Sequence, residues 1–125
     1  MKKGMMIFWV IILLLVVAGL GVSVLGGRGS DKLNGFAQCL TDKGAIFYGA
    51  FWCPHCQAQK RAFSNSAKLL PYVECSTPDG QGQLQVCKDK EIKQYPTWEF
   101  SDGSRLTGEV PLTQLAEKTG CVLPG

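Results

Sequence analysis

The chain has 125 residues, with 13 lysines and arginines against 10 aspartates and glutamates and a formal net charge of +3. This length favours a single domain, and a small net charge without a basic stripe excludes a nucleic-acid-binding surface. All six cysteines lie beyond residue 38, which is typical of a protein that works in an oxidising compartment.

The amino-terminal segment is apolar. Residues 4–27 carry no charge and follow Lys2 and Lys3. As a helix this stretch would extend roughly 36 Å, against about 30 Å for the hydrocarbon core of a bilayer. We expect residues 1–27 to be an uncleaved signal anchor that spans the membrane once, with the following domain outside the cytoplasm. A cleaved signal peptide is the alternative, although no Ala-x-Ala site follows the apolar core.

Residues 28–30 form the expected linker, and residues 31–125 form the expected folded domain. Apolar residues at helical spacing predict a helix over residues 31–42. Residues 45–51 are apolar and aromatic, which is typical of a buried strand.

The remaining segments continue this alternation of helices and strands. Turn residues and apolar periodicity divide them. The expected elements are a helix from Pro54 through residues 57–70, a strand at 71–75, a loop at 76–83, a helix at 84–93, strands at 96–100 and 105–109 joined by a turn, and a helix at 112–119. This order predicts an α/β fold with a mixed sheet of about four strands and helices on both faces.

The motif Cys53-Pro54-His55-Cys56 stands where the first strand meets the next helix. Two cysteines separated by two residues can close into a disulfide and open again. Cys53 would lie at the amino end of the helix, where unpaired N–H groups favour a thiolate, so it should be the exposed nucleophile. Cys56 should be buried and resolve the mixed disulfide, and His55 should further stabilise the Cys53 thiolate. The redox-active disulfide would be the only cofactor.

Two other interpretations of the paired cysteines are weaker. A Cys-x-x-Cys pair can be half of a zinc site, but the other cysteines lack the paired spacing of a second half, so no metal is expected. A haem attachment motif needs a histidine after the second cysteine, and Gln57 stands there.

The motif from Phe51 to Cys56 and the later Tyr95-Pro96-Thr97 resemble the thioredoxin superfamily, over about residues 31–121. Residues 48–57, 72–75 and 94–100 are similar to the thioredoxin-like domain associated with vitamin K epoxide reductase homologues. The Pro54-His55 dipeptide is similar to that of the periplasmic disulfide oxidase DsbA.

The resemblance implies a thioredoxin-like fold and a cis peptide bond before Pro96, which would place the backbone of Tyr95 beside the disulfide. Trp52, Pro54, Tyr95 and Pro96 would then bind the substrate chain. Thioredoxins also carry a buried acid six residues before the first active cysteine, and Phe47 stands there instead. This difference argues against efficient reductase turnover.

The resemblance further implies two structural disulfides, Cys75–Cys87 and Cys39–Cys121. Each would stabilise the fold by roughly 2–4 kcal/mol. A rival hypothesis makes Cys75 and Cys87 a second redox pair that relays electrons.

These observations predict a membrane-anchored, extracytoplasmic thiol-disulfide oxidoreductase that forms or exchanges disulfides in exported proteins. The expected partners are thiol-containing exported proteins, the membrane through residues 4–27, and a vitamin K epoxide reductase-like membrane oxidase. The alternatives are an extracytoplasmic reductase, as in cytochrome c maturation, and a redox-silent binding module with the same groove.

Overall fold

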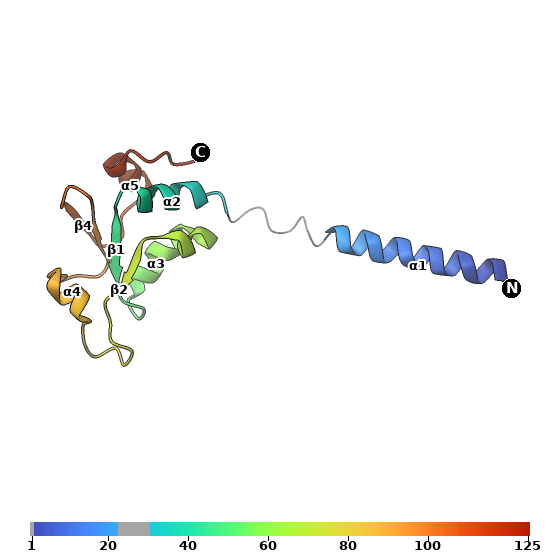
Figure 1. Ribbon diagram of the computed structural model, residues 1–125, viewed down its shortest axis with the longest axis horizontal. Coiled ribbons are helices and arrows are strands. Elements are labelled where there is room, and N and C mark those ends of the chain that lie inside the picture. The colour runs from blue at the N-terminus through green and yellow to red at the C-terminus, as the bar shows by residue number, and fades with distance from the viewer. Residues whose placement is uncertain (1, 23–30) are drawn as a thin grey trace.

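The computed structural model describes residues 2–22 and 31–125, with side chains for residues 2–17 and 31–125 (Figure 1). The predicted linker, residues 28–30, lies outside the described residues. The boundaries proposed for the amino-terminal segment and the folded domain stay predictions.

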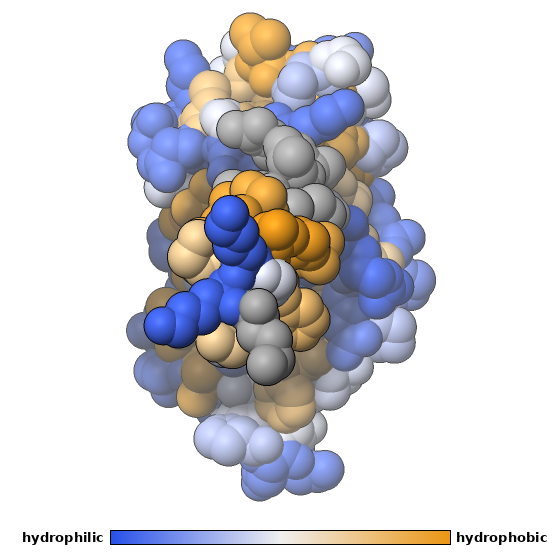
Figure 2. All heavy atoms as spheres, turned by 90° about the vertical axis from the view of Figure 1, so that its right-hand side faces the viewer, coloured by the Kyte–Doolittle hydropathy of each residue, from blue (hydrophilic) through white to orange (hydrophobic). Residues whose placement is uncertain are grey.

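Helix α1 runs over Lys2–Val22. Figure 2 looks at the molecule from the amino-terminal end of α1 and shows hydrophilic side chains at the very front, with hydrophobic side chains around and behind them. Within the part of the chain that the structure describes, no helix has both the length and the hydropathy needed to cross a bilayer. The prediction of a transmembrane helix at the amino terminus is therefore wrong.

Four strands form one mixed sheet in the order β2-β1-β3-β4. Strand β1 (Ile46–Gly49) pairs in parallel with β2 (Tyr72–Glu74) and antiparallel with β3 (Thr97–Glu99), which pairs antiparallel with β4 (Arg105–Thr107). The predicted α/β class and the four-stranded mixed sheet are confirmed. The strands are shorter than the apolar runs that predicted them, because only the paired residues belong to the ladder.

Helices cover both faces of this sheet, as predicted. Side chains of α2 (Asn34–Asp42), α3 (Pro54–Ala62) and α5 (Leu112–Thr119) share one apolar cluster. The short α4 (Gln85–Asp89) contributes to a smaller cluster. In β1, Phe47 belongs to the larger cluster and Tyr48 to the smaller one, because successive side chains of a strand point to opposite faces of the sheet.

The predicted helix over residues 57–70 is divided in two. Helix α3 ends at Ala62, and a 3₁₀ helix, η1, follows over Ser64–Leu69. Ser64 has φ of 53°, a left-handed conformation that breaks the helical hydrogen-bond ladder. Helix α4 is likewise shorter than the predicted 84–93, and Glu91 just beyond it has φ of 52°.

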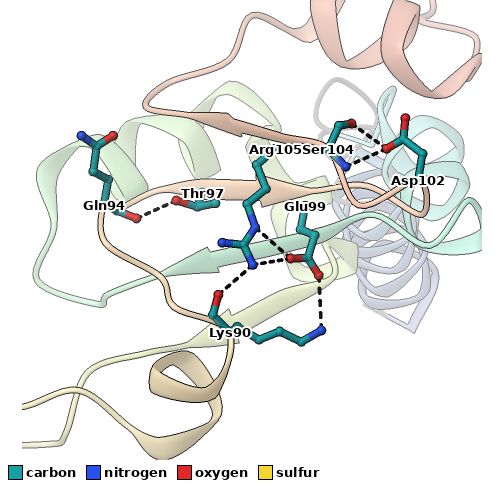
Figure 3. A network of polar contacts seen from close by, with 7 residues as sticks. All are labelled: Lys90, Gln94, Thr97, Glu99, Asp102, Ser104 and Arg105. Carbon is teal, nitrogen blue, oxygen red and sulfur yellow. Dashed lines mark hydrogen bonds and ion pairs between the residues drawn. The ribbon is translucent and has the colours of Figure 1, made fainter.

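A polar network ties the β3–β4 hairpin to the end of α4 (Figure 3). The Arg105 guanidinium donates to Glu99 at 2.9 and 2.6 Å and to the backbone oxygen of Lys90 at 2.7 Å. Asp102 in the turn accepts two hydrogen bonds from Ser104, and these hold the pKa of the Asp102 carboxyl well below its usual range. The hairpin therefore holds the loop that leads into β3.

Candidate functional site

Cys53 begins the helix that carries the motif. It is the N-cap residue of α3, with φ of −77° and ψ of 120°, and Pro54 occupies the first turn. Proline fits there because its ring presets φ and its missing N–H would have no partner within the helix. The Cys53 N–H donates to the Ala50 carbonyl at 3.1 Å, and the Cys53 carbonyl accepts from the Gln57 N–H at 3.1 Å. The local sequence therefore places this sulfur at the positive end of α3.

All six cysteines lie in the described part of the chain, and Cys53 and Cys56 are the two with free thiols. Cys56 is buried, as the sequence predicted. Cys53 is only 5% exposed, so the expectation of an openly exposed nucleophile is corrected. The reason is the loop before β3, because the Cys53 thiol lies 3.7 Å from the backbone oxygen of Tyr95.

Cys56 lies over the end of β1. A Cβ atom added at Gly49 would stand only 2.9 Å from the Cys56 sulfur. Burial, and to a smaller extent the neighbouring Cys53, raise the pKa of Cys56 to about 12, although a backbone hydrogen bond with Ala50 and the charge of Lys60 oppose the rise. The thiol of Cys56 is therefore protonated at neutral pH.

The four residues predicted to bind substrate gather around Cys53. The Tyr95–Pro96 peptide bond is cis, and Pro96 is buried. The rings of Trp52 and Tyr95 meet edge to face at 6.1 Å, and Trp52 remains 48% exposed. Pro54 is exposed at the start of α3. The structure thus brings Trp52, Pro54 and the Tyr95 backbone to one surface beside the Cys53 sulfur.

Polar contacts hold the aromatic residues of this surface in place. The Trp52 indole N–H donates to the Ser76 hydroxyl at 2.9 Å. The Tyr95 hydroxyl accepts from Gln83 at 2.8 Å. Gly80, with φ of 73°, lies close to the Trp52 ring. The loop after β2 therefore positions Trp52. The sequence had predicted only that this segment is a loop.

His55 lies on the outside of the site. Its Nδ1 is 3.8 Å from a Glu109 carboxylate oxygen, and both side chains are half or more exposed. The predicted role of His55 at the Cys53 thiolate stays a prediction. Glu109 is a site residue that the sequence did not indicate, because it lies more than fifty positions away in the chain.

Glu74 is a second residue that sequence reasoning missed. Its carboxylate accepts hydrogen bonds from the Phe51 N–H at 2.9 Å, the Cys75 N–H at 3.0 Å and the Tyr72 hydroxyl at 3.1 Å. An acid in an otherwise apolar strand was the one available signal. Glu74 therefore fixes the turn that leads from β1 to Cys53.

The other four cysteines form two disulfides. Cys39 is bonded to Cys121 and Cys75 to Cys87, with Cα–Cα distances of 5.9 and 5.5 Å. These are the pairs that the resemblance implied. The Cys75–Cys87 bridge is fully buried and belongs to the apolar cluster against which Tyr95 packs. Across the described residues, no three histidine, cysteine or acidic side chains come together as a metal site.

No protein-family model matches this chain. Among curated proteins it matches thiol-disulfide oxidoreductase LTO1 of Arabidopsis thaliana, with 47% identity over 89 residues. The chain is similar to a thiol-disulfide oxidoreductase. The match supports the predicted class of enzyme. It covers 67% of this chain but only 23% of the relative's own length. The narrower resemblance to thioredoxin-like domains associated with vitamin K epoxide reductase homologues stays a prediction.

Proposed function

We propose that this protein is a thiol-disulfide oxidoreductase that exchanges disulfides with partner proteins through Cys53 and Cys56. The observation that carries the proposal is the pair of free thiols at the start of α3, one at the N-cap and one buried a turn later, while the other four cysteines are paired. Similarity to a relative named as a thiol-disulfide oxidoreductase supports it.

The exchange proceeds in two steps. A thiolate of the partner attacks the Cys53 sulfur of the Cys53–Cys56 disulfide, a mixed disulfide forms, and Cys56 leaves as a thiolate that takes up a proton. A second partner thiolate then attacks the partner's own sulfur in the mixed disulfide, and Cys53 leaves as the thiolate. The partner has gained a disulfide, and the protein has gained two thiols. The unpaired N–H groups at the start of α3 favour negative charge on Cys53.

The partner chain is proposed to lie along the loop before β3. The Tyr95 carbonyl next to the Cys53 sulfur can accept a hydrogen bond from an extended backbone, as in strand addition. The exposed Trp52 ring offers an apolar contact beside it. This arrangement favours unfolded, thiol-containing proteins as substrates, because a backbone edge recognises an extended chain without demanding one sequence.

We propose that the protein donates disulfides, in an oxidising compartment outside the cytoplasm. Two disulfides besides the Cys53–Cys56 pair support this location, since such bonds persist where thiols are not kept reduced. A vitamin K epoxide reductase-like membrane oxidase is the proposed electron acceptor that restores the Cys53–Cys56 disulfide. A fully reduced protein would then be a transient product of each turnover.

Trapping tests the site directly. In the Cys56→Ala variant, Cys53 is first converted to its mixed disulfide with thionitrobenzoate by Ellman's reagent. A thiolate of an added reduced, unfolded protein with a single cysteine should then displace thionitrobenzoate and stay bonded to Cys53, since no second thiol resolves the mixed disulfide. The Cys53→Ser variant should form none, although it keeps Cys56. Equal trapping by the two variants would refute the assignment of Cys53 as the attacked sulfur.

The reduction potential tests the direction. A potential near about −120 mV, as in a strong disulfide donor, supports donation, whereas one near about −270 mV, as in thioredoxin, supports the reductase alternative. Equilibration with glutathione, followed by alkylation and mass measurement of the 53–56 peptide, gives the value.

A further inference from the structure

We propose that Lys60 stabilises the negative charge that forms on the Cys56 sulfur during exchange, and that Tyr72 and Glu74 are positioning residues that hold Lys60 there. This inference rests on the proposed function, because Cys56 carries that charge only if it takes part in exchange. It assigns a role to three residues from α3 and β2 that lie outside the Cys53–Cys56 motif.

Lys60 lies on the same face of α3 as Cys56. The two residues are four positions apart, so one stands above the other on the helix surface. The Lys60 ammonium lies 3.5 Å from the centre of the Tyr72 ring. A cation over an aromatic face is attracted by the ring's negative face, which orders a side chain that is otherwise flexible.

The Tyr72 ring is also the neighbour of the Cys56 sulfur. A Cβ atom at Gly49 would stand 2.9 Å from the Cys56 sulfur and 2.9 Å from Cε2 of Tyr72. The sulfur and the ring edge therefore face the same small space, which the missing side chain of Gly49 leaves open. The Tyr72 ring therefore contacts the Lys60 ammonium with its face and the space beside the Cys56 sulfur with its edge.

Tyr72 is itself anchored from two sides. Its hydroxyl donates to the Glu74 carboxylate at 3.1 Å, and its ring packs edge-on against Phe47 at 5.1 Å. Burial, and then the charge and the hydrogen bond of Glu74, raise the pKa of Tyr72 well above its usual value. The phenol therefore stays neutral and keeps donating to Glu74, so the ring orientation under Lys60 is maintained.

The charge on Cys56 needs such support. Burial disfavours a thiolate at this position, and Cys53 disfavours it further, whereas Lys60 favours it. When the partner's thiolate attacks Cys53, the Cys53–Cys56 bond breaks and Cys56 leaves with the electron pair. In the reverse step, Cys56 loses its proton to solvent, attacks Cys53 of the mixed disulfide, and releases the partner as a thiolate. Both directions pass through a negative Cys56 sulfur, so a nearby cation accelerates both.

A reaction of the reduced protein with Ellman's reagent separates the two sulfurs in time. Attack by Cys53 releases one coloured thionitrobenzoate in a first phase, and attack by Cys56 on the Cys53 adduct releases the other in a second phase. We expect Lys60→Met to slow the second phase several-fold at neutral pH and to shift its pH profile upward, with the first phase unchanged. Tyr72→Phe keeps the ring but loses the Glu74 bond, so it should slow the same phase less.

Two matched variants control for charge and for folding. Lys60→Arg keeps a cation over the Tyr72 ring and should keep the second phase near the original rate. Arg61→Met removes a neighbouring, exposed positive charge of α3 and should leave both phases unchanged. Denaturant midpoints measured in parallel show whether Lys60→Met still folds as the parent does.

The outcomes are distinct. An unchanged second phase in a folded Lys60→Met variant, or equal slowing by Arg61→Met, overturns the inference while the proposed function stands. Release of only one thionitrobenzoate per molecule of the unmodified protein overturns the proposed function itself, because Cys56 would then not resolve the adduct.

Discussion

The sulfur of Cys56 occupies the space that a side chain at position 49 would need. Gly49 closes β1, and the Cys56 sulfur and the Tyr72 ring converge above it. A glycine in a strand often marks a place where another group approaches the backbone closely, and here it makes room for the sulfur of Cys56. The residue therefore belongs to the site, although it carries no chemistry of its own.

We predict that Gly49→Ala lowers the free energy of unfolding by roughly 1–3 kcal/mol, because the new methyl group overpacks the space beside Cys56. Urea unfolding of the oxidised protein measures this loss. Gly35→Ala is the matched control, since a Cβ there meets nothing within 4 Å and alanine favours the helix. A Gly49→Ala variant as stable as the Gly35→Ala variant would contradict the close approach.

Protonation of Cys56 predicts how the stability of the reduced protein depends on pH. In the unfolded chain its pKa is near the ordinary value of 9.0, and in the folded chain burial raises the pKa to about 12. The raised pKa contributes stability that is complete below pH 9 and is lost as the pH rises from 9 towards 12. The loss is at most about 1.4 kcal/mol per pH unit for one group.

Urea unfolding of the reduced protein between pH 8 and 11 should therefore show a steeper decline than unfolding of a Cys56→Ser variant. The difference between the two declines gives the contribution of Cys56 alone. The raised pKa values of Tyr48 and Tyr72 also lower stability at high pH, but they do so equally in both proteins. Identical declines would show that the Cys56 thiol ionises alike in the folded and unfolded chain.

Helix α3 is held to the rest of the fold by a buried amide. Gln59 donates to the Val110 carbonyl at 3.1 Å, and its side-chain oxygen accepts from the Val110 N–H at 2.7 Å and from the Trp98 indole at 3.4 Å. The side chain is 2% exposed. This bridge fixes α3, and with it both cysteines of the motif, against β3 and the segment that follows β4.

We predict that Gln59→Leu destabilises the protein by about 2 kcal/mol or more, because it leaves the polar groups of Val110 and Trp98 buried without these partners. Thermal or urea unfolding measures the loss. Gln38→Leu removes an exposed amide that bonds Asp42 within α2 and should change stability by less than about 0.5 kcal/mol. Similar costs for the two variants would argue against the bridge.

At the scale of the whole molecule, two disulfides constrain different parts of the chain. Cys39–Cys121 joins α2 to the residue that follows Gly120 at the end of α5, over a separation of 82 residues. Cys75–Cys87 closes a separation of 12 residues next to the loop that carries Ser76. The first bridge holds the termini of the described domain together, and the second supports the surface around Trp52.

We predict different consequences for removing each bridge. The Cys39→Ala/Cys121→Ala variant should lose about 4.5 kcal/mol of stability, as expected for a long closed loop, and keep both phases with Ellman's reagent. The Cys75→Ala/Cys87→Ala variant should lose about 3 kcal/mol and react with altered rates, since Ser76 and Tyr95 lose their support. Unaltered rates in the second variant would show that the bridge does not position the site.

The sequence by itself placed Cys53 and Cys56 at a strand-to-helix junction, since a proline after Cys53 and the preceding apolar run specify that junction locally. It also determined the order of elements and the four-stranded mixed sheet, because apolar periodicity and turn residues act over short ranges. The four cysteines outside the motif pair as the resemblance implied.

Only the tertiary structure decided which distant side chains join that motif. Tyr72 of β2, which is hydrogen-bonded to Glu74, meets Lys60 of α3 because α3 packs beside β1 and β2, and no local pattern encodes that packing. The break after α3 escaped prediction, since good helix formers continue through residue 70 while Ser64 adopts a left-handed conformation. Local propensity acts between neighbours in the chain, whereas burial and charge at Cys56 depend on the packing of segments that are far apart in it.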